Sequence, residues 1–216
     1  MIKIMKKIKV ILVDDHAVVR AGYKILLKDI DDIEVAAEAE NGNEAIELIK
    51  NNKYDVIVTD MSLPDIGGID LIRKIKTINS DSKILVVTMH EEVVYVEQAL
   101  HSGAMGYMTK SADPQLLSKA IRQISRGKKY IDDELQQRMA HEGSRDKDSI
   151  LSRLSTREFE IFCLLAEGLN TNEISKKLNI SYKTSANYST NIKSKLGAST
   201  VADVARIAIR YNIIKA

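Results

Sequence analysis

The sequence predicts an α/β fold, a doubly wound parallel sheet of five strands, joined to a smaller all-α domain. Two observations predict this class. Short apolar runs alternate five times with amphipathic stretches over the first 126 residues, and only helical patterns follow residue 150. Strands of a parallel sheet are buried on both faces, so they read as continuous apolar runs, and helices commonly connect them.

Each expected strand is a run rich in β-branched and other apolar residues. The five runs are Ile8–Val13, Ile33–Ala37, Val56–Thr59, Ile84–Thr88 and Met105–Thr109. The helical patterns between and after them lie near residues 17–29, 43–52, 68–79, 91–102 and 113–126. The last pattern places its apolar residues on one face, with the period of an α-helix. Right-handed crossovers leave few topologies for such a chain, and the doubly wound sheet is the simplest.

A polar stretch separates the two parts of the chain. Residues 141–149, HEGSRDKDS, contain no large apolar side chain, which predicts a solvated linker. Four helical patterns follow, near residues 156–168, 171–178, 182–196 and 200–210. We therefore expect a first domain, a linker and a second domain at residues 1–128, 129–150 and 151–216.

The composition excludes several classes of protein. The single cysteine, Cys163, cannot form an internal disulfide, and the four histidines lack the spacing of a zinc site. The first apolar run is too short to span a bilayer and makes a poor signal peptide, so we expect a cytoplasmic protein without a membrane segment. Residues 1–150 carry a net charge of −3 and residues 151–216 one of +5, which suggests a polyanion as partner of the second domain.

Polar side chains stand at the carboxyl ends of four expected strands. Asp14 and Asp15 follow the first strand, and Asp60 follows the third, in DVIVTDMSLP. Thr88 ends the fourth strand and Lys110 follows the fifth. In a parallel sheet these ends open onto the same edge, where ligands bind, so we expect the five side chains to meet in one crevice. Taken singly, each aspartate is also explained as a helix cap.

Three carboxylates in one crevice repel each other unless a cation lies among them. Oxygen ligands without nitrogen or sulfur favour Mg²⁺, with Mn²⁺ as a second choice. A carboxylate beside such an ion is a competent nucleophile toward phosphorus. Lys110 and Thr88 would then hold phosphoryl oxygens on the side away from the metal. The pattern therefore predicts that Asp60 is a phosphorylation site.

Four motifs, ILVDDH, TDMSLPDIGG, VVTMH and GYMTKS, together resemble the receiver domain of two-component response regulators, over about residues 7–127. The resemblance implies a flavodoxin-like fold, and it implies that Asp60 takes phosphate from a sensor histidine kinase. It also implies that Asp15, Asp60 and the Ser62 carbonyl bind Mg²⁺ directly, with Asp14 acting through water.

By the same resemblance, Thr88 and Tyr107 form the family's switch pair, in which the hydroxyl moves toward the phosphate and the ring turns inward behind it. Plain core packing, with a satisfied hydroxyl, is the alternative for Tyr107. Many receivers carry a proline after the lysine, whereas Ser111 and Ala112 follow Lys110 here.

The second domain has the layout of a helix-turn-helix, with a helix near 171–178, a tight turn at Asn179 and a helix opened by Ser181. Its motifs, LSTRE, the spacing from Gly168 to ISYK, and KLGA, resemble the LuxR-type helix-turn-helix of NarL/FixJ regulators, in the GacA/UvrY and BvgA branch. The DNA contacts that we expect are Lys183, Thr184, Asn187, Tyr188, Asn191, Lys193 and Lys195.

Two residues depart from that pattern. Ser185 places a hydroxyl where a valine normally packs, and Ala186 removes a phosphate-seeking lysine. The last helix presents small apolar residues that we expect to pair two copies on DNA, or else to pack inside the domain: Val201, Val204, Ala205 and Ala208.

The sequence therefore predicts a transcription regulator that is switched by phosphorylation and is not an enzyme. Its partners would be a cognate histidine kinase, promoter DNA and a second copy of the chain. One alternative is a phospho-regulated adaptor whose helical domain binds protein, which the loss of a lysine at Ala186 supports. The other is an Mg²⁺-dependent phosphohydrolase. Enzymes of the haloacid dehalogenase type carry a D-x-D pattern after the first strand and a cap, and both features are missing from this sequence.

Overall fold

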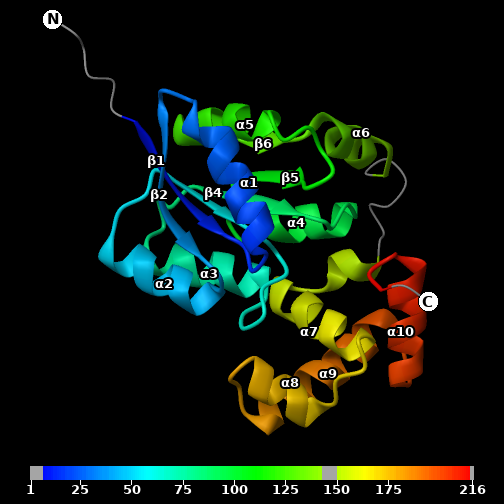
Figure 1. The fold of residues 1–216 in the computed structure, drawn as a ribbon. Coiled ribbons are helices and arrows are strands. Elements are labelled where there is room, and N and C mark those ends of the chain that lie inside the picture. The colour runs from blue at the N-terminus through cyan, green and yellow to red at the C-terminus, as the bar shows by residue number, and fades with distance from the viewer. Residues whose placement is uncertain (1–6, 143–149, 215–216) are drawn as a thin grey trace, which may run out of the picture. The chain divides into compact units, whose positions relative to one another are not determined.

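The computed structural model describes residues 7–142 and 150–214 (Figure 1). Its contacts divide the chain into two compact units. The first unit holds the residues up to Glu91 together with Ala99–Gln137, and the second holds Glu92–Gln98 together with the residues from Arg138 onward.

The first unit is built on a parallel sheet of six strands in the order β2-β1-β3-β4-β5-β6. The strands are β1 (Ile8–Val13), β2 (Ile33–Ala39), β3 (Val56–Thr59), β4 (Ile84–Thr88), β5 (Gly106–Thr109) and β6 (Tyr130–Ile131). The predicted parallel α/β fold is confirmed, with one strand more than the five expected. β1, β3 and β4 lie inside the sheet and are almost wholly buried, as their continuous apolar sequences require.

Helices cover both faces of this sheet (Figure 1). They are α1 (Ala17–Lys28), α2 (Gly42–Asn51), α3 (Gly68–Ile78) and α5 (Leu116–Ser125), while α4 (Val93–His101) and α6 (Asp133–Glu142) each have residues in both units. Alternate strand residues such as Leu12, Val58 and Val87 share one apolar core with Leu27 of α1 and Ile121 of α5. The intervening strand residues point to the opposite face, which α2 and α3 cover together.

The sixth strand and α6 occupy residues that the sequence analysis assigned to the linker. Asp132 lies between them and is only 3% exposed. One carboxylate oxygen accepts the N–H of Thr109 at 2.9 Å, and the other accepts the N–H of Leu135 in the first turn of α6 at 3.0 Å. A strand of two residues has no periodicity to detect, so the pairing of Tyr130–Ile131 with β5 was not predicted. Most of the polar stretch predicted as the linker core, residues 143–149, lies outside the described residues.

Within residues 150–214, the second unit contains a short 3₁₀ helix and four α-helices, η1 (Ile150–Arg153), α7 (Thr156–Ala166), α8 (Thr171–Lys177), α9 (Tyr182–Leu196) and α10 (Val201–Arg210). Three of them begin at a capping box, in which the cap side chain and a carboxylate three residues on exchange hydrogen bonds with the backbone. Ser181 caps α9, and Asn179 takes a positive φ of 50° in the turn before it. Residues from these helices form the core of this unit: Phe159, Phe162, Ile174, Ile192, Val204 and Ala208.

Two glycines provide a stability test of this packing. A Cβ on Gly68 would lie 2.8 Å from the carbonyl oxygen of Met61, the residue after Asp60, so Gly68→Ala must push the β3–α3 loop away from α3. We expect a loss of about 1–3 kcal/mol in the free energy of unfolding, measured by chemical denaturation. Gly22→Ala is the control, because an added Cβ there meets open space in the exposed interior of α1 and should gain about 0.5–1 kcal/mol. Equal effects of the two variants would contradict the close approach at Gly68.

Candidate functional site

The carboxyl edge of the sheet brings three carboxylates together. β1 and β3 are paired in register, Val13 with Thr59, so the residues that follow them, Asp14 and Asp60, are neighbours. The Asp60 N–H donates to the carbonyl of Val13 at 2.9 Å, which extends the ladder to the site itself. Ligand atoms of Asp14, Asp15 and Asp60, together with a ring nitrogen of His16, all lie within 4.8 Å of one another. Asp14 and Asp60 are 5% and 4% exposed.

Lys110, which follows β5, neutralises part of this charge. Its Nζ lies 2.6 Å from Asp14 Oδ2 and 2.7 Å from Asp60 Oδ2. Burial tends to lower the pKa of Lys110, but its hydrogen bonds to the two carboxylates outweigh burial, and the pKa lies above its ordinary value. The ammonium is therefore charged, and one cation faces three carboxylates.

The carboxylate of Asp60 is held in a fixed orientation. Its Oδ1 accepts the N–H of Met61 at 2.6 Å and that of Ser62 at 3.3 Å, while Oδ2 faces Lys110. The hydroxyl of Ser62 lies 3.2 Å from Nε2 of His90, which comes from the loop after β4. Hydrogen bonds from fixed backbone donors leave this carboxylate little rotational freedom.

The two predicted switch residues meet at His90, a residue that the sequence analysis quoted only as part of VVTMH. The hydroxyl of Thr88 accepts the N–H of His90 at 3.4 Å, and the hydroxyl of Tyr107 donates to the His90 carbonyl at 3.0 Å. Thr88 and Tyr107 are both completely buried. The Tyr107 hydroxyl is thus satisfied by the backbone beside Thr88, and β4 and β5 are joined at their site ends.

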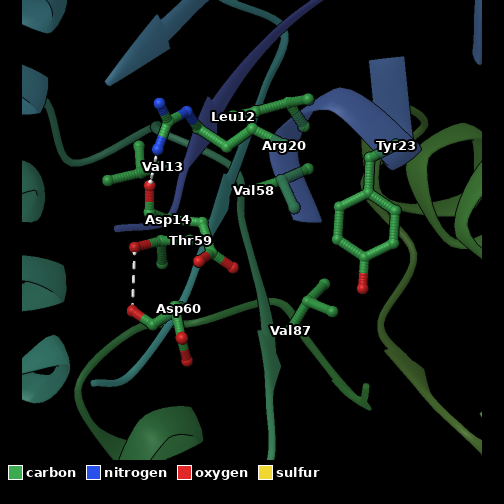
Figure 2. A pocket seen from close by; sticks show the side chains of 9 residues that line it. All are labelled: Leu12, Val13, Asp14, Arg20, Tyr23, Val58, Thr59, Asp60 and Val87. Atoms are coloured by element: carbon green, nitrogen blue, oxygen red, sulfur yellow. Dashed lines mark hydrogen bonds between the residues drawn. The ribbon is translucent and has the colours of Figure 1, made fainter. Parts of the chain in front are cut away.

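A hollow lies behind Asp14 and Asp60, between α1 and the sheet, and Figure 2 shows the side chains that line it. Arg20 and Tyr23 of α1 form its outer wall. Burial raises the pKa of the Tyr23 hydroxyl above its ordinary value; the charge of Lys110 opposes this rise, and those of Asp14 and Asp60 add to it. Neither residue of α1 was predicted from the sequence to take part in the site.

The donor set fits a small divalent cation. The converging oxygens are carboxylates, and three negative charges against the one of Lys110 leave an excess that a divalent ion would cancel. His16 stands at the rim with its Nδ1 2.8 Å from Asp15 Oδ1, and its side chain is 61% exposed. The structure therefore contains an acidic pocket of the kind that the sequence predicts.

The predicted DNA contacts on α9 fall into two groups. Lys183, Thr184, Asn187 and Asn191 are exposed, whereas Tyr188 and Lys193 are half-buried. Lys195 reaches back into the unit, where its Nζ lies 2.6 Å from Glu158 Oε2. Tyr182, the first residue of α9, is 63% exposed and was not among the predicted contacts.

The small-residue stripe of α10 is divided by the fold. Val204 and Ala208 are completely buried in the core of the second unit. Val201 and Ile209 are 45% and 39% exposed, and Ala205 between them is half-buried. An outward apolar row thus runs along the helix at intervals of four residues.

Fold and site together define a class of protein: a parallel sheet with an acidic pocket at its carboxyl edge, joined to a helix-turn-helix unit, is the architecture of a response regulator. Comparison with protein families agrees. Residues 10–122 match the response regulator receiver domain, and residues 152–208 match the luxR family of bacterial regulatory proteins. The chain belongs to the response regulators that carry a LuxR-type helix-turn-helix.

Curated relatives lie in the predicted branch. The chain is 38% identical to the response regulator UvrY of Escherichia coli K12 over 211 residues, covering 97% of each protein. It is 35% identical to the response regulator GacA of Pseudomonas aeruginosa, covering 97% of this chain and 99% of that protein. Among solved structures, RcsB of Salmonella enterica bound to a promoter with the phosphomimetic BeF₃⁻ aligns with a TM-score of 0.75 and 29% identity, over 94% of this chain and 98% of that one.

These comparisons confirm the predicted family, and they confirm that the chain is a regulator and not an enzyme. Within the described ranges, none of the helices is long and apolar enough to traverse a bilayer.

Ser185 provides a test of how this variant helix-turn-helix is packed. Its side chain is completely buried in α9, and within the described residues its Oγ has no hydrogen-bond partner. An unsatisfied buried hydroxyl costs about 1–3 kcal/mol, so Ser185→Ala should stabilise the second unit by about 1 kcal/mol or more. Hydrogen exchange of the α9 amides measures the change. Ser194→Ala, at an exposed position of the same helix, should gain only a few tenths of a kcal/mol in stability, from helix propensity. Equal gains in the two variants would contradict the conclusion that the Ser185 hydroxyl is buried without a hydrogen-bond partner.

Proposed function

We propose that this response regulator accepts a phosphoryl group on Asp60 from a sensor histidine kinase, and that phosphorylation controls promoter binding by its helical unit. One observation carries the proposal. The Asp60 carboxylate is oriented by two backbone N–H groups and by Lys110, beside the carboxylates of Asp14 and Asp15. A role as a helix cap would not explain why Asp60 shares Lys110 with a second buried carboxylate, that of Asp14.

We assign the acidic pocket to Mg²⁺, with Mn²⁺ as a substitute. Asp15, Asp60 and the Ser62 carbonyl would bind the ion, and Asp14 would hold one of its waters. The ion would supply positive charge to the phosphoryl oxygens. One oxygen of Asp60 forms the new bond to phosphorus while the bond from phosphorus to the donor nitrogen breaks, which gives an acyl phosphate. The Lys110 ammonium, already 2.7 Å from Asp60, is placed to donate to a phosphoryl oxygen.

The change at Asp60 would be transmitted through Thr88 and Tyr107. The long 3.4 Å contact of Thr88 with the His90 N–H is weak enough to be exchanged for a hydrogen bond to the phosphoryl group. Losing it would shift the His90 backbone, on which the Tyr107 hydroxyl depends at 3.0 Å. The surface formed by the β4–α4 loop would then respond to phosphorylation as a population shift.

Promoter binding is proposed from the helical unit and its relatives. Structures of RcsB with DNA align with this chain, one of them with two RcsB dimers bound to two parallel DNAs. The exposed face of α9 would read base edges and phosphates, with Lys183, Thr184, Asn187 and Asn191 as its central contacts. Two copies would pair through the outward row of α10, formed by Val201, Ala205 and Ile209. We propose a cytoplasmic location for the regulator.

Replacing the phosphoacceptor gives the first test. Asp60→Asn should reduce phosphoryl incorporation from acetyl phosphate and Mg²⁺ at least 100-fold, because an amide oxygen is a poor nucleophile and forms no stable acyl phosphate. Intact-protein mass spectrometry measures the incorporation. Asp65→Asn is the matched control on the same loop, since the Asp65 carboxylate accepts N–H groups of Gly42 and Asn43 and lies outside the acidic pocket. Incorporation by Asp60→Asn at the rate of the control would show that the assignment is wrong.

The salt dependence of DNA binding gives the second test. Each phosphate neutralised by a lysine contributes about one unit to the slope of log affinity against log salt concentration. Lys183→Met should therefore lower that slope by about one, in gel shifts with a genomic fragment selected for binding. Lys50→Met, an exposed lysine of α2 that pairs with Glu47, should leave it unchanged. A salt-insensitive association of the unmodified chain would favour the protein-binding adaptor instead.

A further inference from the structure

Arg20 is a buried charge that the proposed phosphorylation chemistry does not use. It lies in the second turn of α1, and its side chain is only 8% exposed. Burying a guanidinium is costly unless its donors are matched by acceptors in good geometry. We therefore expect specific hydrogen-bond acceptors around the buried guanidinium of Arg20.

Those acceptors join three parts of the fold. One guanidinium nitrogen, Nη1, donates to the backbone carbonyl of Asp14 at 2.6 Å, the contact drawn as a dashed line in Figure 2. The other, Nη2, donates to Glu40 Oε1 at 2.9 Å, just after β2. The Nε lies 3.8 Å from Glu38 Oε2, near the end of β2, which is an ion pair too long for a hydrogen bond, and within the described residues this Nε has no hydrogen-bond partner. Arg20 thus fastens α1 and the end of β2 to the backbone of the residue that begins the acidic loop.

The Asp14 backbone is held on its other side as well. The backbone N–H of Asp14 donates to the carbonyl of Ala39 at 3.2 Å, and the Asp14 side chain is held as well, because its Oδ1 accepts the His16 N–H at 2.8 Å. The Arg20 bond is the one of these three that holds the Asp14 carbonyl, and its donor carries a charge, so it helps to keep the Asp14–Asp15 peptide in one orientation. That peptide sets the directions in which the two carboxylates point.

A neighbouring lysine shows that charge alone does not explain this contact. Lys24, one turn further along α1, pairs with the same Glu38, but its side chain is 58% exposed and has no contact with Asp14. A guanidinium has several donors in one rigid plane and can hold a carbonyl and a carboxylate together, whereas an ammonium is a single point charge on a flexible stem.

We propose that Arg20 is a positioning residue for the cation site, which holds the Asp14 carbonyl so that the Asp14 and Asp15 carboxylates already face Asp60 before the ion arrives. The inference rests on the proposed assignment of the acidic pocket to Mg²⁺. Without Arg20 the loop must be ordered as the ion binds, and that ordering weakens affinity without changing any ligand. Residues that orient ligands in this way typically alter metal affinity about 10–100-fold when replaced.

The test measures Mg²⁺ binding directly, by isothermal titration calorimetry on the full chain, with Mn²⁺ binding followed by electron paramagnetic resonance. Arg20→Lys should raise the dissociation constant at least about 10-fold. Lys24→Met, which breaks the other pair to Glu38, should change it less than about twofold. The metal-free melting temperature of each variant is recorded alongside. A fall in melting temperature with an unchanged dissociation constant would mean that Arg20 serves stability alone, and would overturn the proposal.

Two further variants keep the outcomes separate. Glu40→Gln leaves the bond from Arg20 to Asp14 in place while removing its charged partner, so it should weaken Mg²⁺ binding less than Arg20→Lys does. If Arg20→Lys does not fold, Arg20→Gln is measured in its place; wild-type Mg²⁺ affinity in that variant overturns the proposal, and a loss of about 10-fold supports it. Asp15→Asn tests the site itself. If it binds Mg²⁺ as the wild type does, or if the wild type binds none, the proposed cation site is wrong, and Arg20 loses its role with it.

Discussion

The acidic pocket brings three carboxylates that repel each other to one edge of the sheet, and the contacts around it must offset that repulsion. Asp14 and Asp60 are nearly buried and Asp15 lies beside them, and together they outnumber the one ammonium of Lys110. Burial strengthens this repulsion, because little water remains to screen it. The chain tolerates the arrangement because register-paired strands hold the first two side chains in place and Lys110 bridges them. In the proposed function, this residual negative charge would draw a divalent cation into the pocket, and the cation would in turn attract a phosphoryl group.

Backbone contacts connect this pocket to the rest of the first unit. His90 joins the ends of β4 and β5 through Thr88 and Tyr107. Asp132 joins the last residue of β5, Thr109, to the first turn of α6. Lys110 directly follows Thr109, the last residue of β5. A rearrangement around the lysine would therefore act on a strand that is hydrogen-bonded to His90 through Tyr107 and to Asp132 through Thr109. In the proposed function, these contacts would carry a change at Asp60 to elements that do not touch the phosphoryl group.

Sequence reasoning predicted those features that carry strong local signals. The five longer strands were predicted from continuous apolar runs, and the carboxylates at their ends from the geometry of parallel sheets. Features defined by tertiary contacts could not be predicted in this way. Tyr130–Ile131 is too short to show a period, and Arg20 reads in sequence as an ordinary helix residue until its contact with the Asp14 carbonyl is seen. For the same reason the pair between Lys195, a predicted DNA contact, and Glu158 could not be read from the sequence.

The central claim is that one divalent ion sits among these carboxylates. Anomalous scattering from crystals soaked in Mn²⁺ measures this directly. The account predicts one strong peak within about 2.2 Å of carboxylate oxygens of Asp15 and Asp60, with the Asp14 carboxylate at the distance of an intervening water. No peak at this edge of the sheet, or a peak bound only by exposed surface carboxylates elsewhere, would contradict it.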